Sequence, residues 1–388
     1  MKKVRTVNYA ALLVTLIIAG ARAHTAGGQA PPLRPDAPRP RWVNISPRWV
    51  STNPNKPSFN FGFQAIAIDP HAPTTLYVGT CYQGLWKTKD GGRSWYRANT
   101  GTNGDVLNGG RLWSLAIDRF SPSTLYAANG YGSWDGRSDA QGIWKSTDGG
   151  TDWQQMLPPT STVAQRTSLD VYEVVTDPYR SGHILVAFHS DWAGLGHPHP
   201  SGLLESTDGG ATWIVHQAPR GWAGGNRYVF FLNNSATWLV GTQDAGYWRT
   251  ADSGKSWHQV SRVGRQDGGG GIYRARNGVW YVGALTGLLR SADDGQTWIV
   301  VGPRPGADGY YTVIGDGRHL YAQTANGGFN TSGPNYYVWS PESDGVHWAR
   351  YNDQLFRDGP MSMAYDPINH VIYSSNWDAG LWKLQTGR

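Results

Sequence analysis

Outside the repeated turns, tryptophan and aspartate stand side by side at three points of this 388-residue chain. The pairs are Trp134-Asp135, Asp191-Trp192 and Trp377-Asp378. Aromatic faces stack on the apolar faces of sugar rings, and two carboxylates can act as general acid and base, their separation deciding a retaining or an inverting outcome. We therefore predict Asp135 and Asp191 as a catalytic pair with Asp378 in reserve, and we expect the three tryptophans and Asp378 to bind substrate. The alternative is that the aspartates cap loop turns and the tryptophans pack at the rim.

A histidine offers a second chemistry. A histidine and a tyrosine could abstract a proton beside a uronic carboxylate while an arginine neutralises that carboxylate. His189 is the catalytic candidate for such a lyase, with Tyr82, Arg111 and Tyr311 as substrate-binding candidates. The alternative is that His189 is a solvent-exposed loop residue.

The nearby HPHP segment is a poor metal signal. Alternate prolines stiffen the loop around His197 and His199, and no third ligand is placed by spacing. We therefore expect no metal and no cofactor.

These residues lie among copies of a repeat that ends in tryptophan. The copies are TKDGGRSW (88–95), STDGGTDW (146–153), STDGGATW (206–213), TADSGKSW (250–257) and SADDGQTW (291–298), with an imperfect copy, SPESDGVHW (340–348). The aspartate can accept backbone N–H groups of its own turn, and the glycine can take the positive φ that a tight hairpin needs. The tryptophan would then begin the next strand and pack its ring into the core.

The repeat belongs to a four-strand unit. Each turn follows a phrase such as GLWKT (84–88), and two further β-rich runs precede that phrase. Successive tryptophans lie 58, 60, 44, 41 and 50 residues apart, which favours propeller blades. The C-terminal segment supplies three strands of a last blade, and residues 41–46, with Trp42, supply the missing strand. We predict an all-β, seven-bladed β-propeller whose N-terminal strand closes the last blade.

The turns resemble the Asp-box (BNR) repeat, and residues 41–388 resemble an Asp-box β-propeller of the sialidase and xyloglucanase superfamily. That superfamily also includes sortilin-type receptor domains and photosystem assembly factors. Sialidases usually carry a Phe/Tyr-Arg-Ile-Pro motif that is absent here, and xyloglucanase-like enzymes usually have two propellers where this chain has one. The resemblance implies that the hairpins lie opposite the functional face. The repeat aspartates are accordingly expected to cap turns, namely Asp90, Asp148, Asp208, Asp252 and Asp293.

The functional face should then carry the loops between the second and third strands of each blade. The long ones span 129–141, 189–201 and 324–336, and a shorter one spans 376–379. Glutamate is scarce, and Glu173 on an inner strand is a further reserve. It could face the central channel or pair with Arg111 or Arg166.

The N-terminus is predicted to be a targeting segment. Residues 1–23 have a charged start, a short apolar run and a small-x-small cleavage pattern, which is typical of a signal peptide. Residues 24–40 are proline-rich and expected to be disordered, which leaves 41–388 as a single propeller. We expect a secreted or periplasmic monomer without stable membrane insertion after cleavage.

Charge and cysteine content narrow the class further. The net charge of +6 falls to +2 without the predicted leader, which removes most support for a nucleic-acid partner. Cys81 is the only cysteine, so the chain forms no internal disulfide. Together these features predict an exported carbohydrate-active propeller, most simply a glycoside hydrolase acting on a glycan. The alternatives are a non-catalytic glycan-binding or scaffolding propeller and a polysaccharide lyase.

Overall fold

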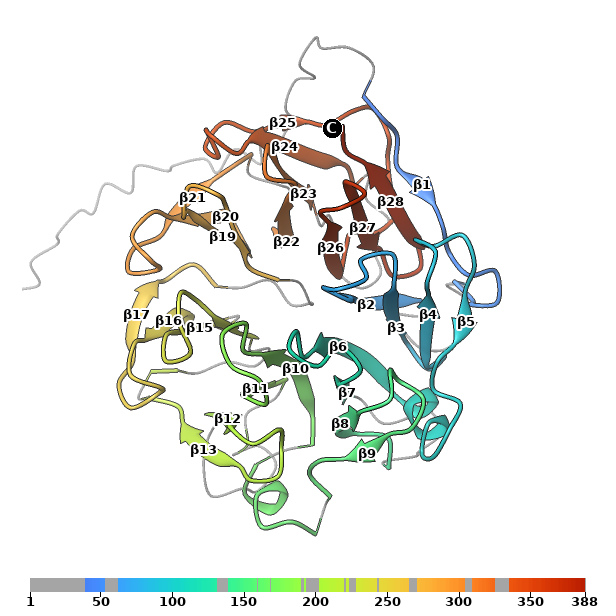
Figure 1. The fold of residues 1–388 in the computed structure, drawn as a ribbon. Coiled ribbons are helices and arrows are strands. Elements are labelled where there is room, and N and C mark those ends of the chain that lie inside the picture. Colours follow the sequence, from blue (N-terminus) through green and yellow to red (C-terminus); the bar gives the residue numbers. More distant parts are fainter. Residues whose placement is uncertain are drawn as a thin grey trace, which may run out of the picture.

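The computed structural model describes residues 39–52, 62–130, 139–158, 160–167, 169–189, 192, 202–219, 221–222, 228–242, 244–264, 271–303, 309–324 and 335–387. Seven antiparallel sheets of four strands each stand in a ring, as Figure 1 shows. This confirms the predicted fold class. In each sheet the four strands follow one another from the ring axis outward, except in the last blade, whose outer strand comes from the N-terminus.

The first four blades cover residues 63–261. They are β2 (Phe63–Ile68), β3 (Leu76–Thr80), β4 (Leu85–Thr88) and β5 (Tyr96–Arg97); β6 (Arg111–Ile117), β7 (Leu125–Gly130), β8 (Gly142–Ser146) and β9 (Gln154–Gln155); β10 (Val171–Thr176), β11 (Ile184–Phe188), β12 (Gly202–Ser206) and β13 (Ile214–Gln217); and β14 (Tyr228–Phe231), β15 (Trp238–Thr242), β16 (Gly246–Thr250) and β17 (His258–Ser261).

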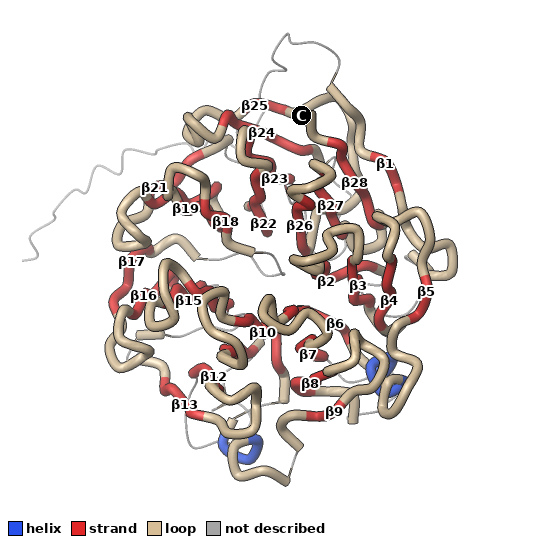
Figure 2. The backbone as a smooth tube through the Cα atoms, in the orientation of Figure 1, coloured by secondary structure: helices blue, strands red, loops and turns tan. Residues whose placement is uncertain are grey.

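The last three blades complete the ring. They are β18 (Tyr273–Arg274), β19 (Trp280–Ala284), β20 (Gly287–Ser291) and β21 (Ile299–Val301); β22 (Tyr310–Gly315), β23 (His319–Thr324), β24 (Tyr337–Pro341) and β25 (Ala349–Arg350); and β26 (Ser362–Asp366), β27 (Val371–Ser375), β28 (Leu381–Gln385) and β1 (Val43–Asn44). Two short 3₁₀ turns, η1 (Asp105–Gly109) and η2 (Ala164–Arg166), lie near the rim in Figure 2. Across the described residues, no helix has both the length and the apolar character needed to cross a bilayer.

The second strand of a blade lies inside the molecule on both faces. Every residue of β3, β11, β15 and β19 is buried. Neighbouring blades pack face to face, so both faces of such a strand contact apolar side chains. This is why runs such as LYVGT and ILVAF read as continuously apolar instead of alternating.

The repeated turn closes on itself through side-chain hydrogen bonds. In the first blade, Thr88 Oγ1 donates to Asp90 Oδ1 at 2.7 Å and accepts the Gly92 N–H at 3.0 Å. Asp90 Oδ1 also accepts the Ser94 N–H at 2.9 Å. Gly92 has φ +84°, which a residue with a Cβ rarely adopts. The aspartate therefore caps its own hairpin, in the way the residue pattern predicts.

A cation on the third strand links several blades to the next. The ammonium group of one blade donates to a backbone carbonyl in the following hairpin, in the pairs Lys87–Gly149 (3.2 Å), Lys145–Gly209 (2.8 Å) and Lys383–Gly91 (3.2 Å). The last of these crosses the seam at which the two ends of the ring meet.

The two ends of the chain close the ring. β1 pairs antiparallel with β28, with Val43 opposite Lys383, and Figure 1 shows the two strands side by side. The Trp42 ring is 3% exposed and stacks on Tyr337 with a centroid separation of 4.0 Å. The N-terminal strand thus completes the last blade, as predicted.

Four inner strands carry an irregularity near their first residues. The register shifts in β2 between Phe63 and Ile66, in β6 between Leu112 and Ser114, in β10 between Val171 and Glu173, and in β22 between Tyr310 and Val313. A β-bulge interrupts the alternation of side chains and redirects some of them. These bulges lie at the ring axis, toward the face that carries the loops between second and third strands.

Candidate functional site

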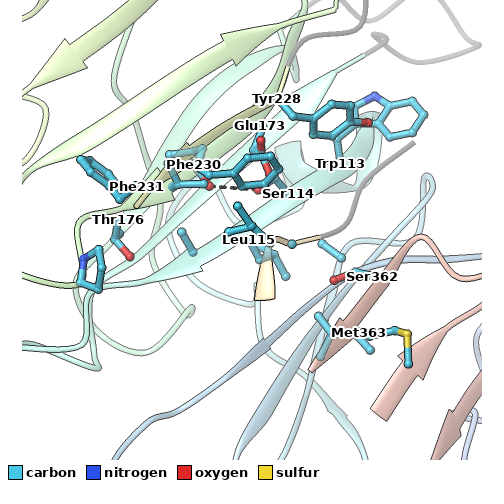
Figure 3. Close-up of a pocket in the computed structure, with 18 residues that line it drawn as sticks. Trp113, Ser114, Leu115, Glu173, Thr176, Tyr228, Phe230, Phe231, Ser362 and Met363 are labelled. Carbon is cyan, nitrogen blue, oxygen red and sulfur yellow. Dashed lines mark hydrogen bonds between the residues drawn. The ribbon is translucent and has the colours of Figure 1, made fainter. Parts of the chain in front are cut away.

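The inner strands enclose an axial cavity of about 340 Å³. Its wall is largely apolar, with Leu115, Phe230 and Met363 among its residues, and Figure 3 shows them around the channel. The polar groups include Ser114, which donates to the Val174 carbonyl at 3.0 Å.

Glu173 lines this cavity. Its side chain is 6% exposed in total, and Oε2 accepts the Val229 N–H at 2.8 Å. Glu173 thus takes the position on the channel that the sequence allowed. The hydrogen bond joins the inner strands of blades 3 and 4, so Glu173 also holds those two blades together.

An aromatic row contributes Trp113 and Tyr228 to the cavity wall. Trp113 and Tyr172 have ring centroids 4.4 Å apart, and Tyr172 contacts Tyr228 edge-on at 5.2 Å. His189 stacks on the same Tyr172 ring at 4.9 Å. The bulges in β6 and β10 place Trp113 and Tyr172 in this row. Sequence reasoning missed both residues because strand alternation does not reveal a bulge.

Tyr82 and Arg111 are brought together. Arg111 Nε donates to the Tyr82 hydroxyl at 3.3 Å, and the guanidinium carbon lies 5.9 Å from the centre of the Trp113 ring. Burial raises the pKa of Tyr82, although the charge of Arg111 opposes the shift. Tyr82 therefore keeps its proton at neutral pH. It can donate a hydrogen bond or a proton, but it is not a base.

His189 is held by a carboxylate. Its ring Nδ1 lies 2.9 Å from Asp170 Oδ2. The backbone N–H of His189 also donates to the backbone carbonyl of Asp170 at 2.9 Å. Both side chains are 20% exposed. A carboxylate on one ring nitrogen orients the imidazole and fixes its tautomer, as required of a general base. Asp170 was not predicted, although it stands directly before the inner strand β10.

Three predicted aromatic residues are buried. Trp192 is fully buried and packs edge-on against Phe188 at 5.2 Å, so it fills the core between blades 2 and 3. Trp377 and Tyr311 are each 3% exposed. None of the three presents the open face that stacking on a sugar ring requires.

Trp377 nevertheless has an unusual backbone. Its φ is +47°, and Tyr82, in the corresponding loop of blade 1, has φ +57°. Bulky residues rarely occupy the left-handed region, and such strain collects at functional sites. The Trp377 N–H and carbonyl both bond to Phe63 at 3.1 Å, which holds the strained loop against blade 1.

The last blade brings two carboxylates near each other. Asp378 accepts a hydrogen bond from Arg357 Nε at 3.2 Å, and a second contact joins Arg357 Nη2 to Asp378 Oδ2. Burial raises the pKa of Asp358 to about 7, and the charge of Asp378 adds to the shift. Burial also raises the pKa of Asp378, which Arg357 opposes. Asp358 is thus largely protonated below pH 7.

Asp358 and Arg357 were not predicted. They lie in the connection from β25 to β26, which reaches the same face as the loop holding Asp378. The loop residues predicted from the sequence all lie between the second and third strands of a blade, not between one blade and the next. The sequence Asp358-Gly359 could have indicated an ordered turn here, because aspartate and glycine favour turns.

Several predicted residues fall outside the described part of the chain. These are Trp134, Asp135, Asp191, His197 and His199. Among the residues that the structure describes, no group of three or more His, Cys, Asp or Glu side chains is arranged to hold a metal ion.

Comparisons place the fold among known propellers. The chain is 24% identical over 288 residues to a xyloglucanase of Hypocrea jecorina, covering 62% of this chain and 32% of the relative. It is 26% identical over 302 residues to a xyloglucanase of Paenibacillus sp., covering 66% and 28%. The chain therefore spans about a third of the length of these curated relatives. No family model matches the sequence.

Solved structures give the same architecture. The GH74 xyloglucanase of Xanthomonas campestris superposes with a TM-score of 0.63 at 17% identity, over 89% of this chain and 54% of that one. YCF48 of Cyanidioschyzon merolae superposes with a TM-score of 0.61 at 13% identity, over 89% and 98%. The class of protein is thus a seven-bladed β-propeller that resembles the propellers of GH74 xyloglucanases.

Proposed function

We propose that this chain is an exported carbohydrate-active propeller that hydrolyses a glycosidic bond of a polysaccharide or oligosaccharide. The proposal is carried by the carboxylates of the last blade, where Asp358 has a pKa of about 7 and Asp378 pairs with Arg357. Weak similarity to xyloglucanases over about two thirds of the chain supports the reaction class.

Burial raises the pKa of both carboxyl groups, and Asp378 also accepts a hydrogen bond from Arg357. A general acid must keep its proton near the working pH, and burial supplies this for Asp358. The second carboxylate must be ionised to activate water or to attack the anomeric carbon. Burial raises the pKa of Asp378, and the charge of Arg357 opposes this shift. Asp135 and Asp191, which lie outside the described residues, are the other candidates for this second role.

Tyr82, Arg111 and the His189–Asp170 pair would line the glycan path. Arg111 and Tyr82 offer hydrogen-bond donors to sugar hydroxyls, and both side chains are partly exposed. The aromatic row beneath them supplies a rigid base. Trp134 is the remaining predicted stacking residue.

The test is hydrolysis of a panel of β-glucans, xyloglucan and related polysaccharides by the full chain. Asp358→Asn should lower kcat at least about a hundredfold, the usual scale for loss of a general acid. Asp378→Asn, Asp135→Asn and Asp191→Asn identify the second carboxylate. Asp353→Asn is the control, because Asp353 pairs with Arg41 and its side chain is 74% exposed. Turnover that survives Asp358→Asn would contradict the assignment.

A lyase is the second candidate, and one contact favours it. Tyr82 is protonated and bonded to Arg111, which suits a proton donor beside a cation that neutralises a uronic carboxylate. His189, oriented by Asp170, would be the base. New ultraviolet absorbance from an unsaturated uronide would establish this reaction. Binding to glycans without any cleavage would instead assign a non-catalytic, glycan-binding or scaffolding role, the third alternative.

Location and assembly form part of the proposal. We expect cleavage after Ala23, export to the periplasm or medium, and a monomer in solution. Intact mass of the exported protein and light scattering measure these properties directly.

A further inference from the structure

We propose a second binding site, for an acidic saccharide, at the seam between blades 7 and 1. It lies on the face of the ring that carries the repeated hairpins. A cavity of about 640 Å³ opens there, opposite the face described above. It is bounded by the hairpin between β4 and β5, the turn between β26 and β27, and the end of β28. The binding residues predicted from the sequence all belong to the other face.

Three cations line the cavity. Lys89 and Arg93 come from the hairpin of blade 1, and Lys383 comes from β28. The side chains of Lys89 and Arg93 are exposed and have no hydrogen-bond or ion-pair partner within the described residues. Lys383 Nζ donates to the Gly91 carbonyl at 3.2 Å, which leaves further N–H groups of the ammonium for a ligand.

The two carboxylates on the cavity wall are already used by the fold. Asp90 accepts N–H groups of its own hairpin, among them that of Arg93 at 2.9 Å. Asp366 Oδ1 accepts the Asn369 N–H at 3.0 Å, and Oδ2 accepts Asn369 Nδ2 at 2.7 Å. These bonds hold the carboxylates in their turns. Hydrogen bonds leave the charge of a carboxylate in place, so the cavity wall carries three cations against two carboxylates.

The other repeats show that the hairpin folds without the two cations found in blade 1. The blade-1 turn, TKDGGRSW, carries two cations, whereas STDGGTDW, STDGGATW and SADDGQTW carry none and TADSGKSW carries one. All of these sequences form the same hairpin, so the turn does not require Lys89 or Arg93. The third-strand cation that links blades, by contrast, recurs as Lys87, Lys145 and Lys383.

The lining indicates a sugar that bears an acidic group. The cavity is much larger than a single oxyanion needs, since a water molecule takes up about 30 Å³ of liquid volume. Thr74, Asn369 and Gln385 offer hydrogen bonds suited to hydroxyls, and Ile368, 68% exposed, offers an apolar rim. A carboxylate or sulfate on the sugar would pair with the cations. Both groups share this chemistry, and the experiment distinguishes them.

The test is calorimetric titration of the full chain with trigalacturonate, with a sulfated disaccharide and with neutral galactotriose. At least one acidic probe should bind, and galactotriose should not. The double variant Lys89→Gln/Arg93→Gln should weaken the acidic probe about tenfold, and added salt should do likewise, because surface ion pairs are screened. Binding of only one acidic probe identifies the acidic group.

Two controls keep the result specific. Lys255→Gln removes the cation of the blade-4 hairpin and should leave the affinity unchanged. Asp358→Asn should also leave it unchanged, so failure of the proposed hydrolase does not affect this site. The proposal is overturned if neither acidic probe binds, if galactotriose binds equally well, or if the double variant, folded by circular dichroism, binds as tightly as the parent. Equal affinity for inorganic sulfate would overturn the saccharide assignment.

Discussion

Asp358 shows how burial changes the chemistry of a single carboxyl group. The sequence offers many aspartates, and hydrogen bonds lower the pKa of those that cap the repeated hairpins. In the hairpins, bonds from Thr212 hold the pKa of Asp208 at about 2. The pKa of Asp358 is shifted in the opposite direction, because burial and the neighbouring Asp378 disfavour its charge. A general acid requires a carboxyl group whose surroundings disfavour the charged form.

The raised pKa of Asp358 predicts a stability effect. Folding raises this pKa from 3.8 to about 7, so the folded chain binds the proton more tightly and loses stability as the pH rises between these values. Asp358→Asn imitates the protonated acid. We expect the variant to be more stable than the parent by about 1–3 kcal/mol at pH 8, with the difference vanishing near pH 4. Urea unfolding at both pH values measures it, and equal stability at pH 8 would contradict the assigned environment.

A buried ionic chain replaces the usual cation in blade 3. Where blades 1, 2, 4, 5 and 7 carry lysine or arginine, this blade has Glu205, which contacts His183 Nε2 at 3.0 Å and His216 Nε2 at 2.7 Å. His183 Nδ1 lies 2.6 Å from Asp177. Burial alone would lower the pKa of His183, but its two carboxylate partners raise it. Burial would raise the pKa of Glu205, but the two histidines lower it to about 2.

The buried row of ionisable side chains in blade 3 predicts a pH range in which the protein is most stable. The contribution of His183 is complete below about pH 6.5 and is lost as the pH rises through its folded pKa. That of Glu205 is complete above about pH 4.5 and is lost toward pH 2. Glu205→Gln should cost about 2–4 kcal/mol at pH 6, because it leaves His216 without this carboxylate partner and His183 with Asp177 alone. The deficit should shrink as the pH rises through the pKa of His183.

Urea unfolding between pH 5 and 9 measures that deficit. His347→Gln is the matched control, because His347 also contacts a carboxylate, that of Asp344, but its side chain is 80% exposed. Its effect should stay below about 0.5 kcal/mol. A deficit for Glu205→Gln that does not change with pH would mean that packing, and not charge, is lost.

At the scale of elements, the hairpin is a self-contained unit. Asp252 accepts the Ser256 N–H at 2.9 Å and the Ser256 hydroxyl at 2.6 Å, while Thr250 donates to it at 2.7 Å. All partners lie within six residues. The sequence therefore contains the whole hydrogen-bond pattern, and the predicted capping role needs no tertiary information.

Removing this cap should lower stability without affecting binding. Asp252→Ala should cost about 1 kcal/mol, the usual scale for a lost side-chain cap. The urea midpoint should fall at unchanged slope, and hydrolysis should match the parent. Lost activity in a variant that still folds would place the hairpin in the reaction and contradict the turn role.

At the scale of the whole molecule, ring closure by the two chain ends determines stability. β1 contributes only Val43 and Asn44 to the last sheet, yet it covers the edge of β28. The surrounding contacts add Trp42 on Tyr337 and a hydrogen bond from the Ile45 N–H to the Leu381 carbonyl at 2.8 Å. An uncovered β28 would be an unpaired edge strand, which favours association.

Deletion of residues 1–46 should lower the thermal midpoint strongly and produce concentration-dependent oligomers. Deletion of residues 1–38 alone is the control and should leave both properties unchanged. Thermal scans and light scattering at two protein concentrations measure the effect. An unchanged midpoint after the longer deletion would show that the ring does not depend on its N-terminal strand.

The sequence by itself determined the number of blades, the hairpins and the closure, because strand pattern and turn chemistry are written over neighbouring residues. Tertiary structure decided which aromatic rings are buried, as for Trp192, and which carboxyl group keeps its proton, as for Asp358. It also decided where Lys89 and Arg93 meet Lys383, a residue almost three hundred positions away. Burial and electrostatic environment depend on residues far away in the chain, and only the closed ring brings those residues together.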